Sequence, residues 1–555
     1  METLRVTWRN VRRVPATATR APVTALTILT FLIPCPVSAA QQVSPLACAT
    51  ADSLTLEALW VDLRGLATAA ELEDWKTRPS ASRCAMLGDM LAERALLAGL
   101  TVEERLAIHY ERLARAFDEW GLRSKRVQDG AADSLGRHPD LMFDDRGLIY
   151  LRMGDPDEVA YTIAGPGMGN RVEGWRYDRP EGRRIYFFSP ITVMGVGVED
   201  FRLLDAPWRA VGGPHAANQL EIVDLADIDI AGYGDSPLRD LYLAFQGLDP
   251  YYATLAYRSV RGGTSLLQDL TEQRRSTMAD VRFAVDSVPD APDLDPSIRF
   301  AWERLRFFNP ASGTTAVWLV AAARGADLTG ETDLEGGSVY RIELSAVLQT
   351  GSAVSRDSVR TVHRLPRELG DEDALVSRIP VSIGPGEHPF MLVIKDGNAE
   401  DGPAGNWARG VLIGLAPSDL PEISDIAVAA DSGGSWTRDG VTHLAVSPSH
   451  LTGPDGEIHL YFEVYGMEAA SPYSVEIRVV PEDLADRMWA VRAADAAFRL
   501  SFSSEMPGSG GIGAHHLRLD LSDTASGAFM LGIRINDAET GRQSLPATTA
   551  VIRPD

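Results

Sequence analysis

The pattern of apolar and polar positions predicts a helical first part of the chain and a β-rich second part. Between about residues 52 and 125, apolar residues recur at steps of three and four, which is the period of an α-helix. One helix is predicted to begin at Thr101, where Thr-x-x-Glu can form a capping box with Glu104. Its apolar stripe is Val102, Leu106, Tyr110, Leu113, Phe117 and Trp120. Further helical runs are predicted at 54–63 and 84–96.

After residue 143 the pattern of apolar positions changes from helical to strand-like. A short β-rich run covers 147–152, and a turn around Pro156 follows, with acids suited to the start of a helix. Two strand-like runs, 173–177 and 184–188, are separated by a hairpin-like connection, and another strand is predicted near 199–204. One helix with three or four strands predicts a compact α+β module.

Residues 238–246 and 266–281 read as helices that bridge this module to the rest of the chain. From about residue 297 the pattern is that of strands, with turn-rich connections and a boundary at 416–421. This spacing predicts two tandem antiparallel β-sandwich-like domains. The apolar runs are 317–321, 339–344 and 390–394 before the boundary, and 423–426, 460–465, 473–479, 517–521 and 529–535 after it.

The expected fold class is therefore multidomain α+β. A chain of 555 residues is too long for a single core. The expected divisions are a signal peptide at 1–40, a helical region at 41–128, the α+β module at 129–212, a helical or irregular linker region at 213–290, and β-sandwich-like domains at 291–417 and 418–555.

The first 40 residues resemble a secretion signal. Five arginines precede a mostly apolar run at 21–33, and small residues before Ala40 suit a signal peptidase. We expect a Sec-type signal cleaved near Ala39/Ala40, and a periplasmic or secreted protein with no transmembrane segment after cleavage. Two alternatives fit less well: Pro34 spoils a lipobox ending at Cys35, and the arginine pair at 12–13 lacks its usual apolar context.

Charge narrows the range of partners. The formal net charge is −24, and the first 40 residues contribute +4, so cleavage would leave −28. Such an acidic surface repels phosphate backbones, and nucleic acid is therefore not an expected partner. A protein or glycan partner in the cell envelope remains compatible with this charge.

Two cysteines, Cys48 and Cys84, remain after signal cleavage. In an oxidising compartment we expect them to form a disulfide that closes a loop of about 36 residues and contributes roughly 3–4 kcal/mol. The alternative is a pair of free, buried thiols.

The motifs in the sequence predict neither a cofactor nor a metal. The chain has no Gly-x-Ser-x-Gly elbow and no His-Glu-x-x-His motif, and with 77 acidic residues a carboxylate pair discriminates nothing. His515 and His516 are adjacent on a predicted strand, so their rings should point to opposite faces. The acidic turn at 396–402 departs from the calcium-loop spacing, which favours an ordinary solvated turn.

One region carries a family resemblance. The residues concerned are Asp145-Arg146-Gly147, Ile149-Tyr150, Gly154, Pro156-Asp157-Glu158 and Trp175-Arg176-Tyr177. Together with the following hairpin they resemble the GWxTD-domain family, which comprises exported bacterial proteins of unknown biochemical role. The resemblance covers about 110–205, and runs at 423–426 and 460–465 also resemble the C-terminal portion of such proteins. The Gly-Trp-x-Thr-Asp element itself is absent: no Thr-Asp follows Trp120-Gly121.

Within this region the candidate binding residues are Asp157, Glu158, Trp175 and Tyr177. The two aromatic residues share one face of a strand, where they can stack on a sugar or pack into a core, and packing is the favoured interpretation. The first hypothesis for function is a non-enzymatic, extracytoplasmic interaction or scaffold protein. The alternatives are a carbohydrate- or peptide-binding protein that uses the aromatic face, and a hydrolase with a dispersed acidic site.

Overall fold

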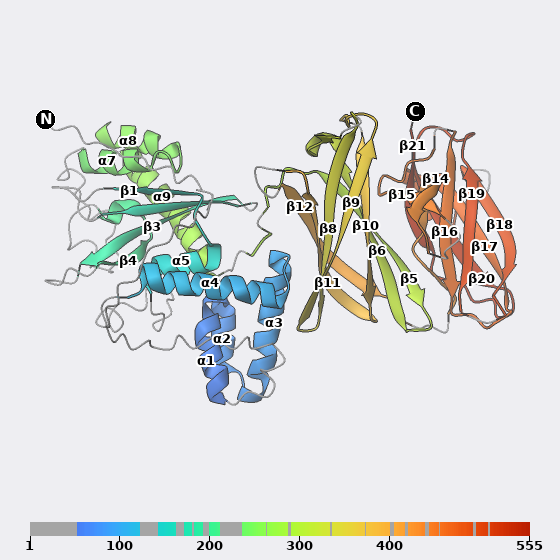
Figure 1. Cartoon of the computed structure of the whole chain (residues 1–555), viewed down its shortest axis with the longest axis horizontal. Helices are drawn as coiled ribbons and strands as arrows, with labels where there is room; N and C mark the ends of the chain where they lie inside the picture. The colour runs from blue at the N-terminus through green and yellow to red at the C-terminus, as the bar shows by residue number, and fades with distance from the viewer. Residues whose placement is uncertain are drawn as a thin grey trace, which may run out of the picture. The chain divides into compact units, whose positions relative to one another are not determined.

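The chain forms two compact units in the computed structural model (Figure 1). The first comprises 1–88 and 106–289, and the second 89–105 and 290–555. The structure describes residues 53–122, 143–162, 171–179, 182–192, 199–210, 236–261, 264–286, 290–292, 294–333, 336–371, 373–399, 404–416, 420–438, 443–453, 455–491, 496–508 and 511–554. The predicted signal peptide and Cys48 lie outside these residues.

The N-terminal part is helical, as the periodicity predicted. Its helices are α1 (Ser53–Leu63), α2 (Ala69–Thr77), α3 (Ser80–Ala98) and α4 (Val102–Trp120). The capping box at the start of α4 is confirmed: the backbone N–H of Thr101 donates to Glu104 Oε2 at 2.9 Å, and the N–H of Glu104 donates to Thr101 Oγ1 at 3.3 Å. Among the described helices, none is both long and apolar enough to cross a membrane.

The buried face of α4 differs from the predicted stripe. Phe117 is exposed, whereas Arg105 and His109 are buried in line with Val102 and Leu113. The Arg105 guanidinium pairs with Asp290 at 3.0 Å, and His109 Nε2 lies 3.0 Å from the carbonyl oxygen of Asp62. Two polar side chains therefore occupy buried positions because each has a hydrogen-bonding partner, which hydrophobic periodicity does not reveal.

A four-stranded antiparallel sheet forms the centre of the first unit, with its strands in sequence order. The strands are β1 (Glu158–Tyr161), β2 (Glu173–Arg179), β3 (Gly182–Thr192) and β4 (Glu199–Leu204). The predicted hairpin between β2 and β3 and the predicted strand at 199–204 are confirmed. Helix α5 (Asp145–Met153) precedes the sheet.

The order of helix and strand around Pro156 was predicted wrongly. Residues 147–152 belong to helix α5, and the segment after the turn is strand β1. Asp144 caps α5 by accepting a hydrogen bond from the backbone N–H of Arg146, and Gly154 ends the helix with a φ of +78°. These two cap residues outweighed the strand-like composition of the run between them.

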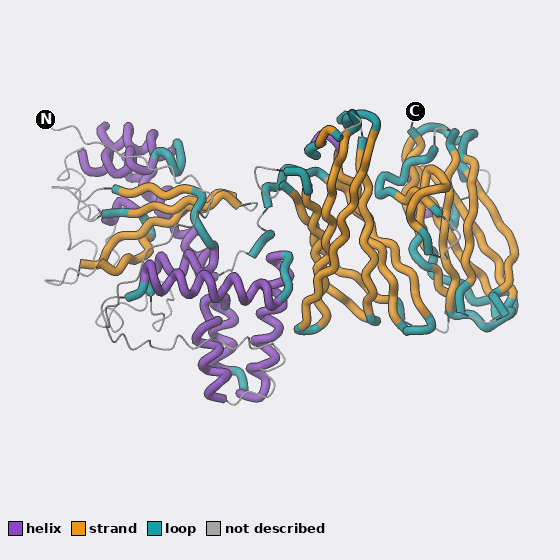
Figure 2. Tube along the Cα trace, viewed as in Figure 1, coloured by secondary structure: helices purple, strands orange, loops and turns teal. Residues whose placement is uncertain are grey.

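Helices cover both faces of the sheet (Figure 2). One face packs against α7 (Ser236–Phe245), α8 (Tyr251–Arg261) and the start of α9 (Thr264–Asp286). The other face packs against α4, α5 and the end of α9. The helices within 236–286 therefore build the core of this unit, and the prediction that they form a linker is wrong for these residues.

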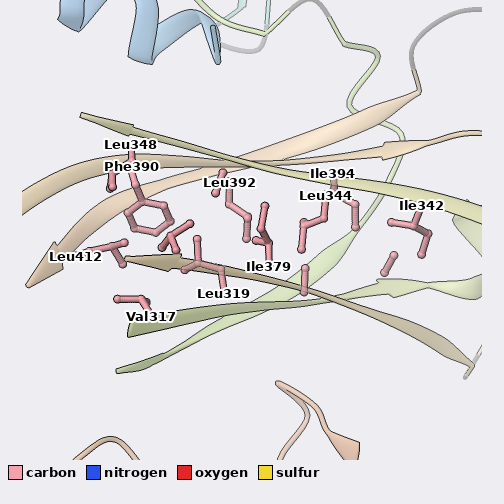
Figure 3. Packing of buried hydrophobic residues seen from close by; sticks show 14 of the residues in the cluster. Val317, Leu319, Ile342, Leu344, Leu348, Ile379, Phe390, Leu392, Ile394 and Leu412 are labelled. Atoms are coloured by element: carbon pink, nitrogen blue, oxygen red, sulfur yellow. The ribbon is translucent and has the colours of Figure 1, made fainter. Parts of the chain in front are cut away.

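In the second unit, a first pair of sheets encloses an apolar core (Figure 3). One sheet has the order β10–β6–β5, with β10 (Ala374–Ile383), β6 (Thr314–Arg324) and β5 (Phe300–Asn309). The other has the order β12–β11–β8–β7, and β9 also pairs with β8. Its strands are β7 (Glu331–Thr332), β8 (Ser338–Thr350), β9 (Ala353–Leu365), β11 (Gly386–Asp396) and β12 (Gly405–Gly414).

A second pair of sheets follows, again with a buried apolar core between them. One sheet contains β13 (Glu422–Ile423), β14 (Ala427–Trp436), β15 (Leu444–Val446), β16 (Glu457–Tyr465) and β19 (Gly513–Asp520). The other contains β17 (Pro472–Pro481), β18 (Phe498–Glu505), β20 (Gly527–Asp537) and β21 (Ala547–Arg553). Antiparallel sheets thus make up most of the C-terminal part of the chain, as predicted.

The two sheet pairs share a further apolar cluster. It joins Leu305, Phe307 and Val320 of the first pair to residues of β14, β15 and β16, among them Trp436 and Tyr461. Polar contacts surround it, including an ion pair between Arg306 and Asp425 at 2.8 Å. The end of β5 around Phe307 and the part of β16 from Leu460 to Tyr465 are therefore buried on both faces.

Candidate functional sites

Two of the residues that carry the family resemblance, Arg146 and Trp175, meet through Glu173 in the first unit. The Arg146 guanidinium lies 2.7 Å from Asp144 Oδ2 and 3.1 Å from Glu173 Oε2, and it stacks 3.6 Å above the ring of Phe201. The indole N–H of Trp175 donates to Glu173 Oε1 at 2.8 Å. We call Asp144, Arg146, Glu173 and Trp175 the Arg146 cluster. It links the start of α5 to strand β2.

The carboxylate of Asp144 is fully engaged within the fold. Burial raises its pKa above the usual value, and the hydrogen bond and charge of Arg146 oppose that rise. The backbone N–H of Phe201 donates to Oδ2 at 3.0 Å, and the neighbouring Asp145 accepts from the N–H of Leu203 at 2.7 Å. Both carboxylates therefore hold β4 against α5, and the oxygens of Asp144 already have donors from the protein.

Trp175 and Tyr177 lie inside the core and form no open aromatic platform. Their side chains are 2% and 0% exposed. Trp175 packs against Trp120 and Phe188, and the hydroxyl of Tyr177 donates to the carbonyl of Gly154 at 3.1 Å. The favoured packing interpretation agrees with this burial, and a ligand-binding role for these two rings conflicts with it.

Asp157 and Glu158 lie at the surface and do not meet the two aromatic rings. Asp157 Oδ2 accepts from the backbone N–H of Asp178 at 2.7 Å and pairs with Arg179 at 3.2 Å. Glu158 is the cross-strand neighbour of Arg176, and their side chains form an ion pair at 2.5 Å. Because side chains alternate along a strand, Glu158 and Arg176 lie on the face of the sheet opposite Trp175. The four predicted binding residues therefore do not form one site.

Cys84 lies on α3 and is disulfide-bonded. Cys48 lies outside the described residues, so its pairing with Cys84 stays a prediction.

A buried cluster of polar side chains around a single carboxylate, that of Glu463, lies at the junction of the two sheet pairs and was not predicted. Glu463 on β16 is buried; its Oε1 accepts from the hydroxyl of Tyr461 at 2.8 Å and from Arg438 Nε at 3.1 Å, and its Oε2 accepts from Tyr465. Burial and the adjacent Glu463 charge raise the pKa of Tyr465. Tyr465 also accepts from the backbone N–H of Phe308 on β5 at 3.0 Å, so the cluster connects the two sheet pairs.

A histidine–glutamate pair crosses the same junction. His450 Nε2 lies 2.8 Å from Glu303 Oε2, and both side chains are largely buried. Burial lowers the pKa of His450, but the hydrogen bond and charge of Glu303 outweigh it, so the pKa lies above its ordinary value. Burial likewise raises the pKa of Glu303, although His450 opposes that rise. The charge of His450, and with it this contact between the two sheet pairs, therefore depends on pH.

Strand β9 lies at the edge of its sheet, with β10 of the facing sheet close by. It pairs with β8 along all thirteen of its residues, and no strand within the described ranges pairs with its other edge. Two other sheet edges are covered: the N–H of Thr452 donates to the carbonyl of Ile552 on β21, and Arg304 donates to the carbonyl of Val411 on β12. An unpaired edge presents backbone donors and acceptors to another chain.

The outward face of β9 is basic. Arg356, Arg360 and Arg364 are exposed on one face of the strand, and Val362, between Arg360 and Arg364 on the same face, is 51% exposed. Arg356 pairs with Glu104 at 2.7 Å and Arg360 with Glu343 at 2.9 Å. We call these three arginines the β9 basic stripe. It stands out in a chain with a net charge of −24.

The histidines at 515 and 516 point to opposite faces, as predicted. His515 faces inward, stacks on Phe462 and lies 2.7 Å from the hydroxyl of Tyr473. His516 is exposed and lies beside His459 of the neighbouring strand β16. Burial and the nearby His516 lower the pKa of His459. Sequence reasoning compared neighbours along the chain and therefore missed this cross-strand pair.

The turn at 396–398 is occupied by internal hydrogen bonds. Asp396 accepts from the backbone N–H groups of Thr329 at 2.7 Å and Asn398 at 2.9 Å. The Asn398 amide donates to the carbonyls of Thr329 and Val339, both at 2.8 Å. Asp396 and Asn398 are buried, so this part of the turn is not solvated as predicted. Across the described ranges, no three His, Cys, Asp or Glu side chains are placed to share a metal ion.

Comparison with known proteins adds little. No family model matches the chain, and no curated protein matches it. Among solved structures, red sea bream transglutaminase is 8% identical with a TM-score of 0.14, over 53% of this chain and 36% of that one. Bacteroides uniformis beta-glucuronidase is 8% identical with a TM-score of 0.19, over 43% and 26%. The chain thus spans about a third and a quarter of their lengths, and likenesses this weak carry no argument about function.

Proposed function

We propose that this chain is an exported interaction protein, and that the unpaired edge of β9 receives an extended, acidic segment of a partner protein as an additional strand. The observation that supports this proposal is the combination of an unpaired thirteen-residue edge with the β9 basic stripe. In strand addition, main-chain hydrogen bonds supply affinity and alternate side chains supply specificity. The export part of the proposal rests on residues 1–40 alone.

Charge favours a different protein over a second copy of this chain. Antiparallel pairing of two β9 strands would place arginines of both copies side by side, and like charges facing each other across strands are destabilising. Natural edges often carry charges for that reason. An acidic partner strand would instead meet the stripe with opposite charge. It would pair with Arg364 and share the other two arginines with Glu104 and Glu343, while Val362 offers an apolar contact between the charges.

A designed peptide can test the proposal directly. The probe is a fluorescein-labelled nine-residue peptide in which Glu alternates with Val and Thr, titrated with the full chain and followed by fluorescence anisotropy. We expect saturable binding that weakens as NaCl rises, because exposed charges are screened. Methylating alternate backbone nitrogens of the peptide should abolish binding, since it removes donors without changing side chains.

Substitutions in the protein locate the binding edge. The double variant Arg360→Glu/Arg364→Glu should weaken binding by at least about ten-fold, because it places like charges opposite the peptide. The matched control is Arg553→Glu on β21, an edge strand that residues near Thr452 already cover. Equal binding by wild type and the double variant, or equal binding of the methylated peptide, would contradict the proposal.

The two other hypotheses receive less support. A glycan or peptide platform on Trp175 and Tyr177 would need both rings to leave the core. A hydrolase with a dispersed acidic site would need carboxylates with free oxygens, whereas Asp144, a buried carboxylate with a raised pKa, already accepts hydrogen bonds from Arg146 and Phe201. We further propose that the two sheet pairs are separate β-sandwich domains divided near residue 417, and that α5 with β1–β4 corresponds to the GWxTD-like module.

A further inference from the structure

Two surface histidines lie diagonally across neighbouring strands in the second unit. Strands β16 and β19 are antiparallel, with His459 opposite Arg518 and Tyr461 opposite His516. Nδ1 of His459 lies 3.4 Å from Nε2 of His516. The two ring centroids are 5.6 Å apart, and the ring planes differ by 23°. Both rings therefore present a nitrogen to the same small volume on the outward face of the sheet.

The separation of the two nitrogens matches the edge of a tetrahedral coordination shell. With Zn–N distances of about 2.0–2.1 Å, two ligands of a tetrahedral zinc ion lie about 3.3–3.4 Å apart, whereas adjacent ligands at a right angle lie about 2.9 Å apart. The same distance is long for a hydrogen bond. We propose that His459 and His516 bind a zinc ion on this face.

The surrounding charges favour a dication. The carboxylates of Asp431 and Glu457 lie close enough to act electrostatically on His459. The nearby cation is Arg518, and Glu457 forms an ion pair with it. Asp455 and Asp520 also act on Arg518. Carboxylates thus outnumber cations near the pair, where Arg553, which acts on Asp520, is a second guanidinium, and the local field attracts a positive ion.

The site would be open. Because the described part of the chain places no third His, Cys, Asp or Glu beside the pair, the protein supplies two ligands and water fills the remaining positions. His515 is not a ligand, since its ring faces the core and lies 2.7 Å from the hydroxyl of Tyr473. An open zinc ion of this kind can accept a further ligand from solution or from another protein.

Metal titration tests the site. The full chain, without a polyhistidine tag, is titrated with Zn²⁺ by calorimetry. We expect one site whose affinity falls by at least about ten-fold in either His459→Gln or His516→Gln, because losing a ligand costs no less than losing a second-shell partner. The matched control is His443→Gln, which removes an exposed histidine just before β15 and should leave the titration unchanged.

Cobalt substitution tests the geometry independently of the variants. Co²⁺ bound to the wild type should give the intense visible bands of a tetrahedral site. The proposal is overturned if the wild type binds no Zn²⁺, if the Co²⁺ spectrum is that of an octahedral ion, or if both histidine variants titrate like the wild type. A lower metal-free melting temperature in the variants combined with unchanged Zn²⁺ binding would likewise overturn it, because the pair would then serve only cross-strand packing.

Discussion

Replacing Arg146 with Met should destabilise the first unit strongly, because it removes the cation that bridges two nearly buried carboxylates, of which Glu173 has a second, more distant partner in Arg171 at 4.0 Å. The side chains of Asp144 and Glu173 are 3% and 12% exposed, and that of Arg146 is 13% exposed. Removing one partner of a buried ion pair costs about 3–5 kcal/mol. We expect about 3 kcal/mol, because Glu173 can regain some hydration and the Met side chain can still cover Phe201.

Hydrogen exchange at β4 measures this loss locally. The backbone N–H groups of Phe201 and Leu203 donate to the carboxylates of Asp144 and Asp145. A loss of about 3 kcal/mol should accelerate their exchange about 100-fold where local opening controls it. The control is Arg183→Met, which breaks an exposed ion pair in the same sheet and should cost less than about 1 kcal/mol.

The pH dependence of the Arg146→Met effect has a defined sign. In the wild type, burial raises the pKa of Asp144, and Arg146 opposes that rise. Without Arg146, the folded-state pKa of Asp144 moves further above its unfolded value, so the protonated form is favoured in the folded state. Destabilisation should therefore be smallest near pH 4 and grow as pH rises through the raised pKa. A loss below about 1 kcal/mol, or one independent of pH from 4 to 8, would refute this reasoning.

Three further predictions concern other parts of the chain. Trp175→Ala should cost about 3–5 kcal/mol in unfolding experiments, as expected of a buried aromatic residue, and should change no glycan binding. The raised pKa of His450 beside Glu303 predicts stability that is fully present below about pH 6.5 and is lost as pH rises through the raised value; His450→Gln should flatten this profile in thermal melts. Mass spectrometry of a non-reduced digest should find Cys84 linked to Cys48, and two alkylated thiols would contradict that pairing.

Sequence reasoning succeeded where a single local preference dominated. The capping box at Thr101 placed the start of α4, and the alternating pattern around Glu173 placed the β2–β3 hairpin. It failed at 147–152, where Leu, Ile and Tyr favour a strand and the cap residues Asp144 and Gly154 favour a helix. Capping by a residue outside the run decided the outcome, and composition within the run did not contain that information.

Buried polar residues limited how well the buried face of a helix could be predicted. The buried face of α4 includes Arg105 and His109. A prediction based on apolar positions alone therefore placed the buried face at a different angle around the helix. Each of the two has a partner far along the chain, Asp290 for Arg105 and Asp62 for His109. The position of such a partner depends on tertiary packing, which periodicity within one helix does not encode.

The candidate sites depend on strand register in the same way. His459 and His516 are 57 residues apart and meet only because β16 and β19 pair with one particular register. A shift of that register by one residue would turn one ring to the other face of the sheet. Glu463 shows what signal was nevertheless present: it lies between two tyrosines on one face of β16, in the part of the strand where all residues from Leu460 to Tyr465 are buried. That part of the face forms the junction between the sheet pairs, where Tyr461 and Arg438 hydrogen-bond the carboxylate of Glu463. Glu457 on the same face is instead partly exposed and pairs with Arg518, so the partners of each acid, and not its position in the strand, separate the two cases.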